Sequence, residues 1–370
     1  MKFEYGDGKG RSCFVRSTFA LLALLFVAFF AWTAFLTPSS REDTSGWKLV
    51  DNLQSLSSGR CKSKCRPPGS EALPEGIVKA TSNLQMSRLW GYSQEMLRFK
   101  KSLFTATVGI NQKSLVNMAV TKFLSNNMTV MLFHYDGNVD EWKQFEWSSH
   151  VIHVSAQNQT KWWFAKRFLH PDIVSSYEYI FLWDEDLGVQ NFNPKNYISI
   201  IKREGLEISQ PALDLKFSEI HQQITARVES ASVHRRTFKK GSCFKNSTKP
   251  PCTGWVEMMA PVFSQASWRC VWYMIQNDLI HAWGLDHQLG YCAQGDRTKK
   301  IGVVDEEYIV HYGRPTLGGG AMSEIKSSSH LRKLDPRLEV RRQSYKELFI
   351  FKNRWKNAAM EDQCWTDPYI

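Results

Sequence analysis

The segment Tyr179–Gly188, YIFLWDEDLG, joins an apolar run to three consecutive acids. The apolar run has the length and composition of a buried β-strand, which places Asp184, Glu185 and Asp186 at the carboxyl end of that strand. Adjacent carboxylates repel one another, and none is easily buried without a partner. A metal ion, a cluster of Arg or Lys side chains, or water alone would satisfy them.

Strands and helices alternate around this segment. The expected strands are Ser102–Gly109, Thr129–Gly137, His150–Ala156, Glu178–Asp186 and Leu206–Leu213, and the expected helices cover about 111–123, 161–174 and 193–205. This alternation predicts an α/β fold with a mostly parallel sheet and helices on both faces. Ligands bind at the carboxyl ends of strands in such sheets. Asp136 and the three acids fall at two of these ends.

The N-terminal region contains a candidate membrane span. Thr18–Leu36 carries no charged residue, and its length at about 1.5 Å per residue matches a bilayer core. Lys2, Lys9, Arg11 and Arg16 precede it, which predicts a cytosolic N-terminus. The alternative is a cleaved signal peptide, whose apolar region is usually shorter and ends at a small-residue cleavage site. We expect a retained single-pass anchor of type II in the Golgi membrane, with the endoplasmic reticulum as the alternative.

The rest of the chain is then expected to lie in the lumen. The predicted parts are a cytosolic tail (1–17), the span (18–36), a Ser/Pro/Gly-rich stem (37–76), a luminal domain (77–357) and a C-terminal tail (358–370). Within the luminal domain, we expect two halves, which cover about 100–215 and about 216–330. Glycosylation sequons begin at Asn127, Asn158 and Asn246.

Seven cysteines follow the anchor, and an oxidising lumen favours pairing among them. Cys243 and Cys252 bracket a loop-like stretch, so we predict that they form a disulfide. Seven is an odd number, so at least one cysteine is free or bonds another chain, which would link an oligomer. A zinc site is the less favoured alternative, because no second ligand pair completes one.

The net charge of +11 is compatible with several anionic partners. No nucleic-acid motif is present, so nucleic acid is not an expected partner. A basic loop contains Arg235, Arg236, Lys239, Lys240, Lys245 and Lys249. This loop either steers an anionic acceptor or donor phosphates, or is a solvated face. Trp255, Trp268, Trp272 and Trp283 either stack on an acceptor sugar or fill the core.

The acidic triplet has a specific chemistry if it is extended, because Asp184 and Asp186 then point to the same side. Two such carboxylates suit Mn²⁺ or Mg²⁺, with diphosphate oxygens and water completing the coordination. The cation would stabilise a nucleoside diphosphate as a leaving group. The alternative is a solvated acidic turn.

Longer motifs carry a family resemblance. Residues of about 100–215 resemble the nucleotide-binding half of glycosyltransferases of the A-type fold, which place a D-x-D motif after the fourth strand. FLWDEDLGVQNFNP, ISQPALD, HAWGLDHQLGYCA and VDEEYIVHYG resemble a plant family, domain of unknown function 707, over most of 70–360. That family is also labelled lysine-ketoglutarate reductase trans-splicing related. A nicotinamide oxidoreductase is disfavoured, because the G-x-G-x-x-G fingerprint is missing.

The glycosyltransferase resemblance implies roles for particular residues. Asp184 and Asp186 would hold the metal and the donor diphosphate, and His311 would be a late metal ligand. Asp286 would be the base that takes the proton of the acceptor hydroxyl. The alternatives are a core or surface role for His311, and a helix cap or ion pair for Asp286. His287 adjoins Asp286 and would either substitute for it or pack.

The nucleoside is expected at the end of the first strand. Thr105, Ala106 and Thr107 lie there in the sequence and would contact it. Asp136 would meet a ribose hydroxyl or the metal held by Asp184.

Together these features predict a metal-dependent glycosyltransferase that moves a sugar from a nucleotide-sugar to a glycan or polysaccharide acceptor, with anionic polymers among the candidates. The alternative from another class is a non-catalytic luminal glycan-binding or scaffolding protein on the same fold. A metal-dependent hydrolase or phosphatase ranks last, because it would need more His and Asp ligands at several strand ends.

Overall fold

β4 (Tyr177–Trp183) lies near the middle of the sheet, and its side chains alternate between two hydrophobic layers. Ile180 and Leu182 pack into one layer, whereas Phe181 and Trp183 pack into the other. Successive side chains of a strand point to opposite faces, so a strand that is apolar at every position must be covered on both. β4 is the strand that the sequence predicts before the three acids.

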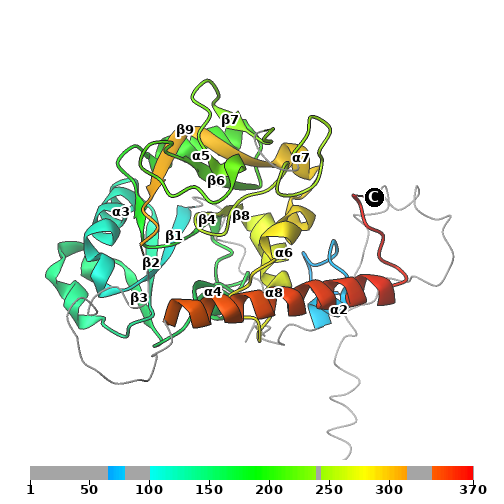
Figure 1. Ribbon diagram of the computed structural model, residues 1–370. Coiled ribbons are helices and arrows are strands. Elements are labelled where there is room, and N and C mark those ends of the chain that lie inside the picture. The colour runs from blue at the N-terminus through cyan, green and yellow to red at the C-terminus, as the bar shows by residue number, and fades with distance from the viewer. Residues whose placement is uncertain (1–65, 80–100, 239–242, 315–335, 370) are drawn as a thin grey trace, which may run out of the picture. The chain divides into compact units, whose positions relative to one another are not determined.

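The computed structural model describes residues 66–79, 101–238, 243–314 and 336–369 (Figure 1). The other strands are β1 (Lys101–Val108), β2 (Thr129–His134), β3 (Ile152–Ser155), β5 (Leu187–Gly188), β6 (Ile208–Leu213), β7 (Val233–His234), β8 (Val262–Ser264) and β9 (Ile301–His311). The α-helices are α2 (Glu75–Lys79), α3 (Lys113–Ser125), α4 (Lys161–Phe168), α5 (Pro194–Arg203), α6 (Gln265–Met274), α7 (Arg297–Lys300) and α8 (Pro336–Glu361). Short 3-10 helices are η2 (Ile110–Gln112), η3 (Asp140–Gln144), η4 (Glu146–His150), η5 (Gln223–Thr225) and η6 (Asp286–Cys292).

Among these residues, nine strands form one sheet in the order β3-β2-β1-β4-β8-β6-β9-β5, with β7 paired to β9. β3, β2, β1 and β4 are parallel, as are β6 and β9, whereas β8, β5 and β7 run antiparallel to their neighbours. The predicted α/β class is confirmed, but the sheet is mixed rather than mostly parallel. The antiparallel strands are only two or three residues long, which is too short for a detectable strand pattern.

Helices cover both faces of the sheet, as predicted. α3 and α5 pack on one face, and α4 and α6 pack on the other. Phe123 of α3 stacks on Phe104 of β1 with ring centroids 3.8 Å apart. On the opposite face, Phe164 of α4 stacks on Phe133 of β2 at 4.9 Å. Burying one such ring contributes roughly 2 kcal/mol, so these contacts fix the helices over the strands.

Helix caps explain where the helices begin. The hydroxyl of Thr160 accepts from the amide of Trp163 at the start of α4. Asn193 caps α5, and Pro194 occupies the first turn, where its missing N–H costs nothing. The helix expected over about 111–123 begins at Lys113 without a side-chain cap, because the chain first makes η2.

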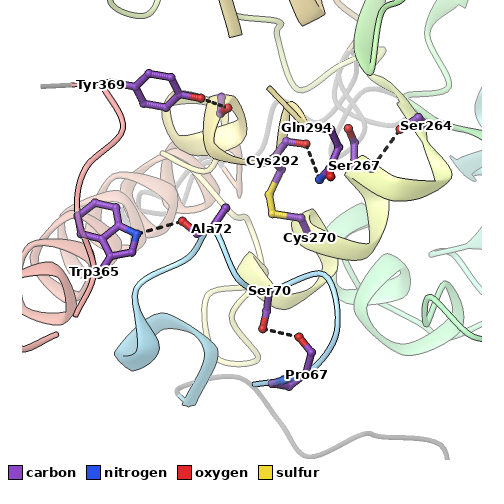
Figure 2. The surroundings of a disulfide bond; sticks show 11 residues. Pro67, Ser70, Ala72, Ser264, Ser267, Cys270, Cys292, Gln294, Trp365 and Tyr369 are labelled. Carbon is purple, nitrogen blue, oxygen red and sulfur yellow. Dashed lines mark hydrogen bonds between the residues drawn. A yellow bond between two sulfur atoms is a disulfide. The ribbon is translucent and has the colours of Figure 1, made fainter. Parts of the chain in front are cut away.

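The ends of the described chain belong to the folded unit. Leu73 and Ile77 are fully buried in the layer that contains α6. The indole of Trp365 donates to the carbonyl of Ala72 at 3.0 Å, and the hydroxyl of Tyr369 donates to that of Gly290 at 2.5 Å (Figure 2). The folded unit therefore extends past both limits of the predicted 77–357 domain.

Disulfides tie together parts of the second half. The predicted Cys243–Cys252 disulfide is present. A second disulfide, Cys270–Cys292, joins α6 to η6 (Figure 2). Cys364 is disulfide-bonded as well. The sequence did not reveal the Cys270–Cys292 pair, because the two residues do not bracket a recognisable loop.

The predicted membrane span, 18–36, lies outside the described residues, as does most of the stem. Within the ranges that the structure describes, no helix is long and apolar enough to cross a bilayer. The sequon asparagines Asn127, Asn158 and Asn246 are all exposed.

Candidate active site

The carboxyl ends of three neighbouring strands meet at one edge of the sheet. Val108 of β1 is in register with His134 of β2, and Ala106 of β1 is in register with Trp183 of β4. The residues that follow these strands, including Gly109, Asp136 and the acidic triplet, therefore lie along one edge. The predicted position of the acids after the fourth strand is confirmed.

Asp184 is paired with a lysine from α4. Nζ of Lys161 lies 2.6 Å from Oδ1 of Asp184 and donates to the carbonyl of Met258 at 2.5 Å. The lysine side chain is 9% exposed and the aspartate side chain is 42% exposed. Asp184 thus has a cationic partner within the protein, and its exposed carboxylate faces solvent.

Glu185 is satisfied differently. The hydroxyl of Tyr135 donates to its Oε1 at 2.7 Å, and the amide of Gly109 donates to its Oε2 at 2.5 Å. Burial raises the pKa of Glu185 to about 8, against the opposing effect of these two hydrogen bonds. Gly109 must be glycine here, because a Cβ would lie 2.3 Å from the Tyr135 hydroxyl. Glu185 therefore joins the loops after β1, β2 and β4.

Asp186 faces His311. Oδ2 of Asp186 lies 3.5 Å from Nε2 of His311 and accepts from the amide of Arg314 at 2.8 Å. Burial and the charge of Asp184 raise the pKa of Asp186. Nδ1 of His311 lies 2.8 Å from the carbonyl oxygen of Glu219, which can only accept, so Nδ1 carries a proton. Nε2 faces the carboxylate, where it can donate a proton as imidazolium or offer a lone pair to a cation.

The pairing of β5 with β9 brings these residues together. Leu187 of β5 is in register with His311, the last residue of β9. The amide of Tyr312 donates to the carbonyl of Asp186 at 3.1 Å. Two segments that are distant in the sequence thus hold Asp186 and His311 side by side, as the glycosyltransferase resemblance implies.

The residues expected around the nucleoside lie differently. β1 continues to Val108, so Thr105 and Ala106 are inside the strand rather than at its end. The hydroxyl of Thr105 donates to the carbonyl of Phe181 at 2.7 Å, and Ala106 packs in a hydrophobic layer. The hydroxyl of Thr107 is buried and has no partner within the described residues.

Asp136 holds the strand-end loops together. Its Oδ2 accepts from the amide of Ile110 at 2.7 Å, and its Oδ1 accepts from the amide of Asn138 at 3.0 Å. Its carboxylate therefore connects the loop after β1 to the loop after β2. Neither contact excludes a ligand, but both of its oxygens already accept backbone hydrogen bonds.

A second polar group lies next to His311 and was missed in the sequence. His221 lies between two carboxylates, 3.0 Å from Glu219 and 3.3 Å from Glu257. Its hydrogen bond with Glu257 raises the pKa of His221 to about 9. The rings of His221 and His311 are 5.4 Å apart. Glu219 and His221 follow β6, so the strand-end rule was the available signal, whereas nothing in the sequence marked Glu257.

Asp286 belongs to this second group. It begins η6, is half-buried, and its carboxylate makes a hydrogen bond with the backbone of His287. Burial raises the pKa of Asp286, and the charge of Glu257 adds to the effect. Oε2 of Glu257 is buried without a hydrogen-bond partner among the described residues. The rings of Trp255 and His287 lie beside these acids, 6.4 Å apart.

The side chains of this site could hold a divalent cation only if a bound ligand supplied further oxygen atoms. Across the described ranges, no three His, Cys, Asp or Glu side chains are arranged to hold a metal by themselves. Asp186 and His311 converge, whereas Asp184 is drawn to Lys161. Mg²⁺ at phosphate sites usually takes one or two carboxylates, and substrate oxygens and water complete its shell. The pair Asp186 and His311 meets that smaller requirement.

Residues 64–361 match the model of the family described as "Protein of unknown function (DUF707)". The chain belongs to the DUF707 family. The segments that carry the resemblance in the sequence include the acidic triplet, η6 and β9, so this family's shared region contains both polar groups of the site.

Several solved structures resemble this DUF707 chain at low identity. TarS from S. aureus in complex with UDP-GlcNAc is 11% identical with a TM-score of 0.39, and the match covers 73% of this chain and 69% of that one. TarS in complex with UDP is 12% identical with a TM-score of 0.37, over 57% and 59% of the two chains. The 4-diphosphocytidyl-2C-methyl-D-erythritol synthase of Anaerococcus prevotii is 10% identical with a TM-score of 0.31, over 57% and 89%. No curated protein matches the chain.

Proposed function

We propose that the protein is a nucleotide-sugar-dependent glycosyltransferase whose donor diphosphate binds at the strand ends that carry Asp184 and Asp186. One observation carries the proposal: β5 and β9 bring Asp186 within 3.5 Å of Nε2 of His311, and the carbonyl of Glu219 fixes the other ring nitrogen. The carboxylate and Nε2 can share a proton or hold a metal cation between them, and the proposal assigns this place to Mn²⁺ or Mg²⁺.

The cation, when bound, would neutralise the diphosphate and make it a better leaving group. The protein's own cations contribute to the same end. Lys161 lies against Asp184, and the guanidinium of Arg314 lies over the ring of Tyr312 at 5.2 Å. Arg314 also donates to Gln112 at 3.2 Å, which directs its charge towards η2 at the end of β1. These side chains would bind and orient the phosphates.

The acceptor hydroxyl must lose a proton during transfer, and the proposal assigns this step to Asp286. A general base works best when its pKa is close to the working pH, and burial raises the pKa of Asp286 in that direction. Glu257 is the second candidate, because one of its carboxylate oxygens has no hydrogen-bond partner among the described residues. Glu257 contacts His221, and the ring of His221 lies next to that of His311. The proposed acceptor base and the proposed donor site would therefore lie side by side.

The proposal places this domain in the Golgi lumen behind an N-terminal anchor. Disulfides form and persist in oxidising compartments, and Cys243–Cys252 and Cys270–Cys292 support such an address. The exposed sequon asparagines are compatible with glycosylation there.

A second candidate function is glycan binding without catalysis. The ion pair of Lys161 with Asp184 favours it, because a protein cation satisfies this acid without any metal. The two functions differ in whether a nucleotide binds in a metal-dependent way.

The test is a thermal-shift panel on the full chain in detergent, with nucleoside diphosphates and nucleotide-sugars, each with and without Mn²⁺. The variant Asp186→Asn removes a proposed ligand, and Asp140→Asn is the control, because the Asp140 side chain is 89% exposed and forms a surface ion pair with Lys143. The proposal expects one nucleotide to stabilise the parent and the control with Mn²⁺, and to lose this effect in Asp186→Asn. A folded parent that responds to no nucleotide would favour glycan binding instead.

A further inference from the structure

The inner face of α8 is fixed by specific contacts. Glu347 accepts from the backbone amide of His281 at 2.8 Å and lies 2.9 Å from its Nδ1. The two terminal nitrogens of the Arg354 guanidinium, Nη1 and Nη2, each lie 2.8 Å from a carboxylate oxygen of Asp278. Phe351 and Trp355 are buried in the layer that contains α6. These contacts determine which face of α8 points outward, and α8 lies beside α2 (Figure 1).

The outward face carries large apolar side chains. Leu338, Tyr345, Phe349 and Met360 are 57%, 57%, 67% and 64% exposed. At 3.6 residues per turn they fall within about 60° of one another around the helix axis. A surface helix normally presents polar residues on this side. Trp283 is 38% exposed and extends the row, because its ring packs edge-on against Tyr345 at 4.9 Å.

Cations accompany the rings on the same face. The exposed basic residues of α8 are Arg341, Arg342, Lys346, Lys352 and Lys356, and its exposed acids are Glu339 and Glu361. By helical spacing, Lys356 falls within the same 60° sector as the apolar side chains and interrupts their line between Phe349 and Met360 along the helix axis. A face that inserts into a bilayer would be apolar without interruption along this line. The interruption favours a partner that meets rings and cations together.

A groove runs beside this face. It has a volume of about 430 Å³ and is lined by Phe349, Asn353, Arg354, Asn357 and Glu361, among others. Asn353 and Asn357 are one helical turn apart, so their carboxamides lie on the same side of α8. Carboxamides donate and accept hydrogen bonds, as sugar hydroxyls require, and an aromatic ring at the rim offers a flat apolar surface.

We propose that the α8 face, defined as Trp283, Tyr345, Phe349, Lys352 and Lys356 with the adjoining groove, binds an anionic polysaccharide. The rings would stack on the apolar faces of the sugars, and the lysines would pair with their carboxylates. A helix of 26 residues at about 1.5 Å per residue presents an extended track rather than a single pocket, which suits a polymer. That this polymer is the acceptor rests on the proposed function, whereas its binding does not.

The test measures binding of the full chain in detergent to immobilised polygalacturonate, with fully methyl-esterified pectin as the uncharged polymer. Tyr345→Ala/Phe349→Ala removes two rings and keeps the charge. Lys352→Gln/Lys356→Gln removes two charges and keeps the rings. Lys245→Gln/Lys249→Gln is the matched control, because it removes two exposed charges from the basic loop. Thermal unfolding confirms that each variant is folded.

The proposal expects binding to polygalacturonate that falls at least tenfold in both α8 variants and stays within twofold in the loop control. Methyl-esterified pectin should bind more weakly than polygalacturonate. Equal losses in the loop control, or unchanged binding without the rings, would overturn the proposal, since either points to unspecific charge attraction. Binding to phosphatidylserine vesicles that falls in both α8 variants, while polymer binding stays unchanged, would overturn it in favour of a membrane. Vesicle binding that is equal in all variants would come from the predicted anchor. If the chain bound the polymer but responded to no nucleotide, the polysaccharide site on the α8 face would be supported and the proposed glycosyltransferase function would be contradicted.

Discussion

Nε2 of His311 lies 3.5 Å from Oδ2 of Asp186, while Nδ1 of the same ring lies 2.8 Å from the carbonyl oxygen of Glu219. The carbonyl fixes a proton on Nδ1, so Nε2 is the ring nitrogen that faces the carboxylate. The two groups stay together when a proton or a metal cation lies between them. The pairing of β5 with β9 imposes this arrangement, and the proposed donor site depends on it.

Lys161 should stabilise the fold through its two buried contacts. Lys161→Met removes the cation beside Asp184 and the donor to Met258, and we expect the free energy of unfolding to fall by about 1–2 kcal/mol. Lys143→Met is the matched control, because the Lys143–Asp140 pair is exposed and should contribute nothing measurable. Urea unfolding of both variants measures the difference. Equal stabilities of the two variants would show that the Lys161 contacts are not formed.

Lys166 should make stability depend on alkaline pH. Its Nζ donates to the carbonyl of Trp272 at 2.7 Å and lies 3.6 Å from the centroid of that ring. Burial lowers the pKa of Lys166 from 10.5 to about 7. Between these values the unfolded chain holds more protons than the folded one, so stability should rise with pH by at most about 1.4 kcal/mol per unit.

Lys166→Met removes the titrating group and should abolish this part of the rise. Urea unfolding at several pH values between 7 and 10 compares the parent with the variant. A variant that keeps the full slope of the parent would assign the pH dependence to other groups.

The Cys270–Cys292 disulfide should be a major source of stability. It closes a loop of 22 positions, and a loop of this length corresponds to about 3 kcal/mol in the chain-entropy description. Cys270→Ala/Cys292→Ala should therefore lower the free energy of unfolding by about that amount. The Cys243–Cys252 disulfide closes a loop of only 9 positions. Cys243→Ala/Cys252→Ala should therefore lower the free energy of unfolding by a smaller amount. The reverse order, measured by urea unfolding, would contradict this ranking.

The sequence predicted the parts of the fold that depend on local pattern. β4 is apolar at nearly every position, and α5 begins at Pro194, directly after its cap Asn193. In each case the pattern of apolar residues or the helix cap can be recognised within one short stretch of the sequence. The short strands β5, β7 and β8 form because longer strands lie beside them. No local sequence pattern therefore predicts them.

The site was predictable where its residues follow strands. Asp186 and His311 lie 3.5 Å apart, as the resemblance implies, whereas Asp184 pairs with Lys161 instead of joining them. Lys161 was missed, because it is the first residue of an ordinary amphipathic helix and its partner is known only from tertiary structure. Glu257 was missed for the same reason, since it lies in an irregular segment between Trp255 and Met259. Thr105 and Ala106 were placed at a strand end, but β1 continues past them to Val108.

The most direct measurement is a calorimetric titration of the full chain with the nucleotide that the thermal-shift panel identifies, with and without Mn²⁺. It compares the parent with Asp186→Asn, His311→Ala and the control Asp140→Asn. We predict that nucleotide binding requires Mn²⁺. The affinity should weaken at least 30-fold (about 2 kcal/mol) in the Asp186 and His311 variants and stay unchanged in the control. Equal affinity in all four proteins, or binding without Mn²⁺, would contradict the donor site proposed at Asp186 and His311.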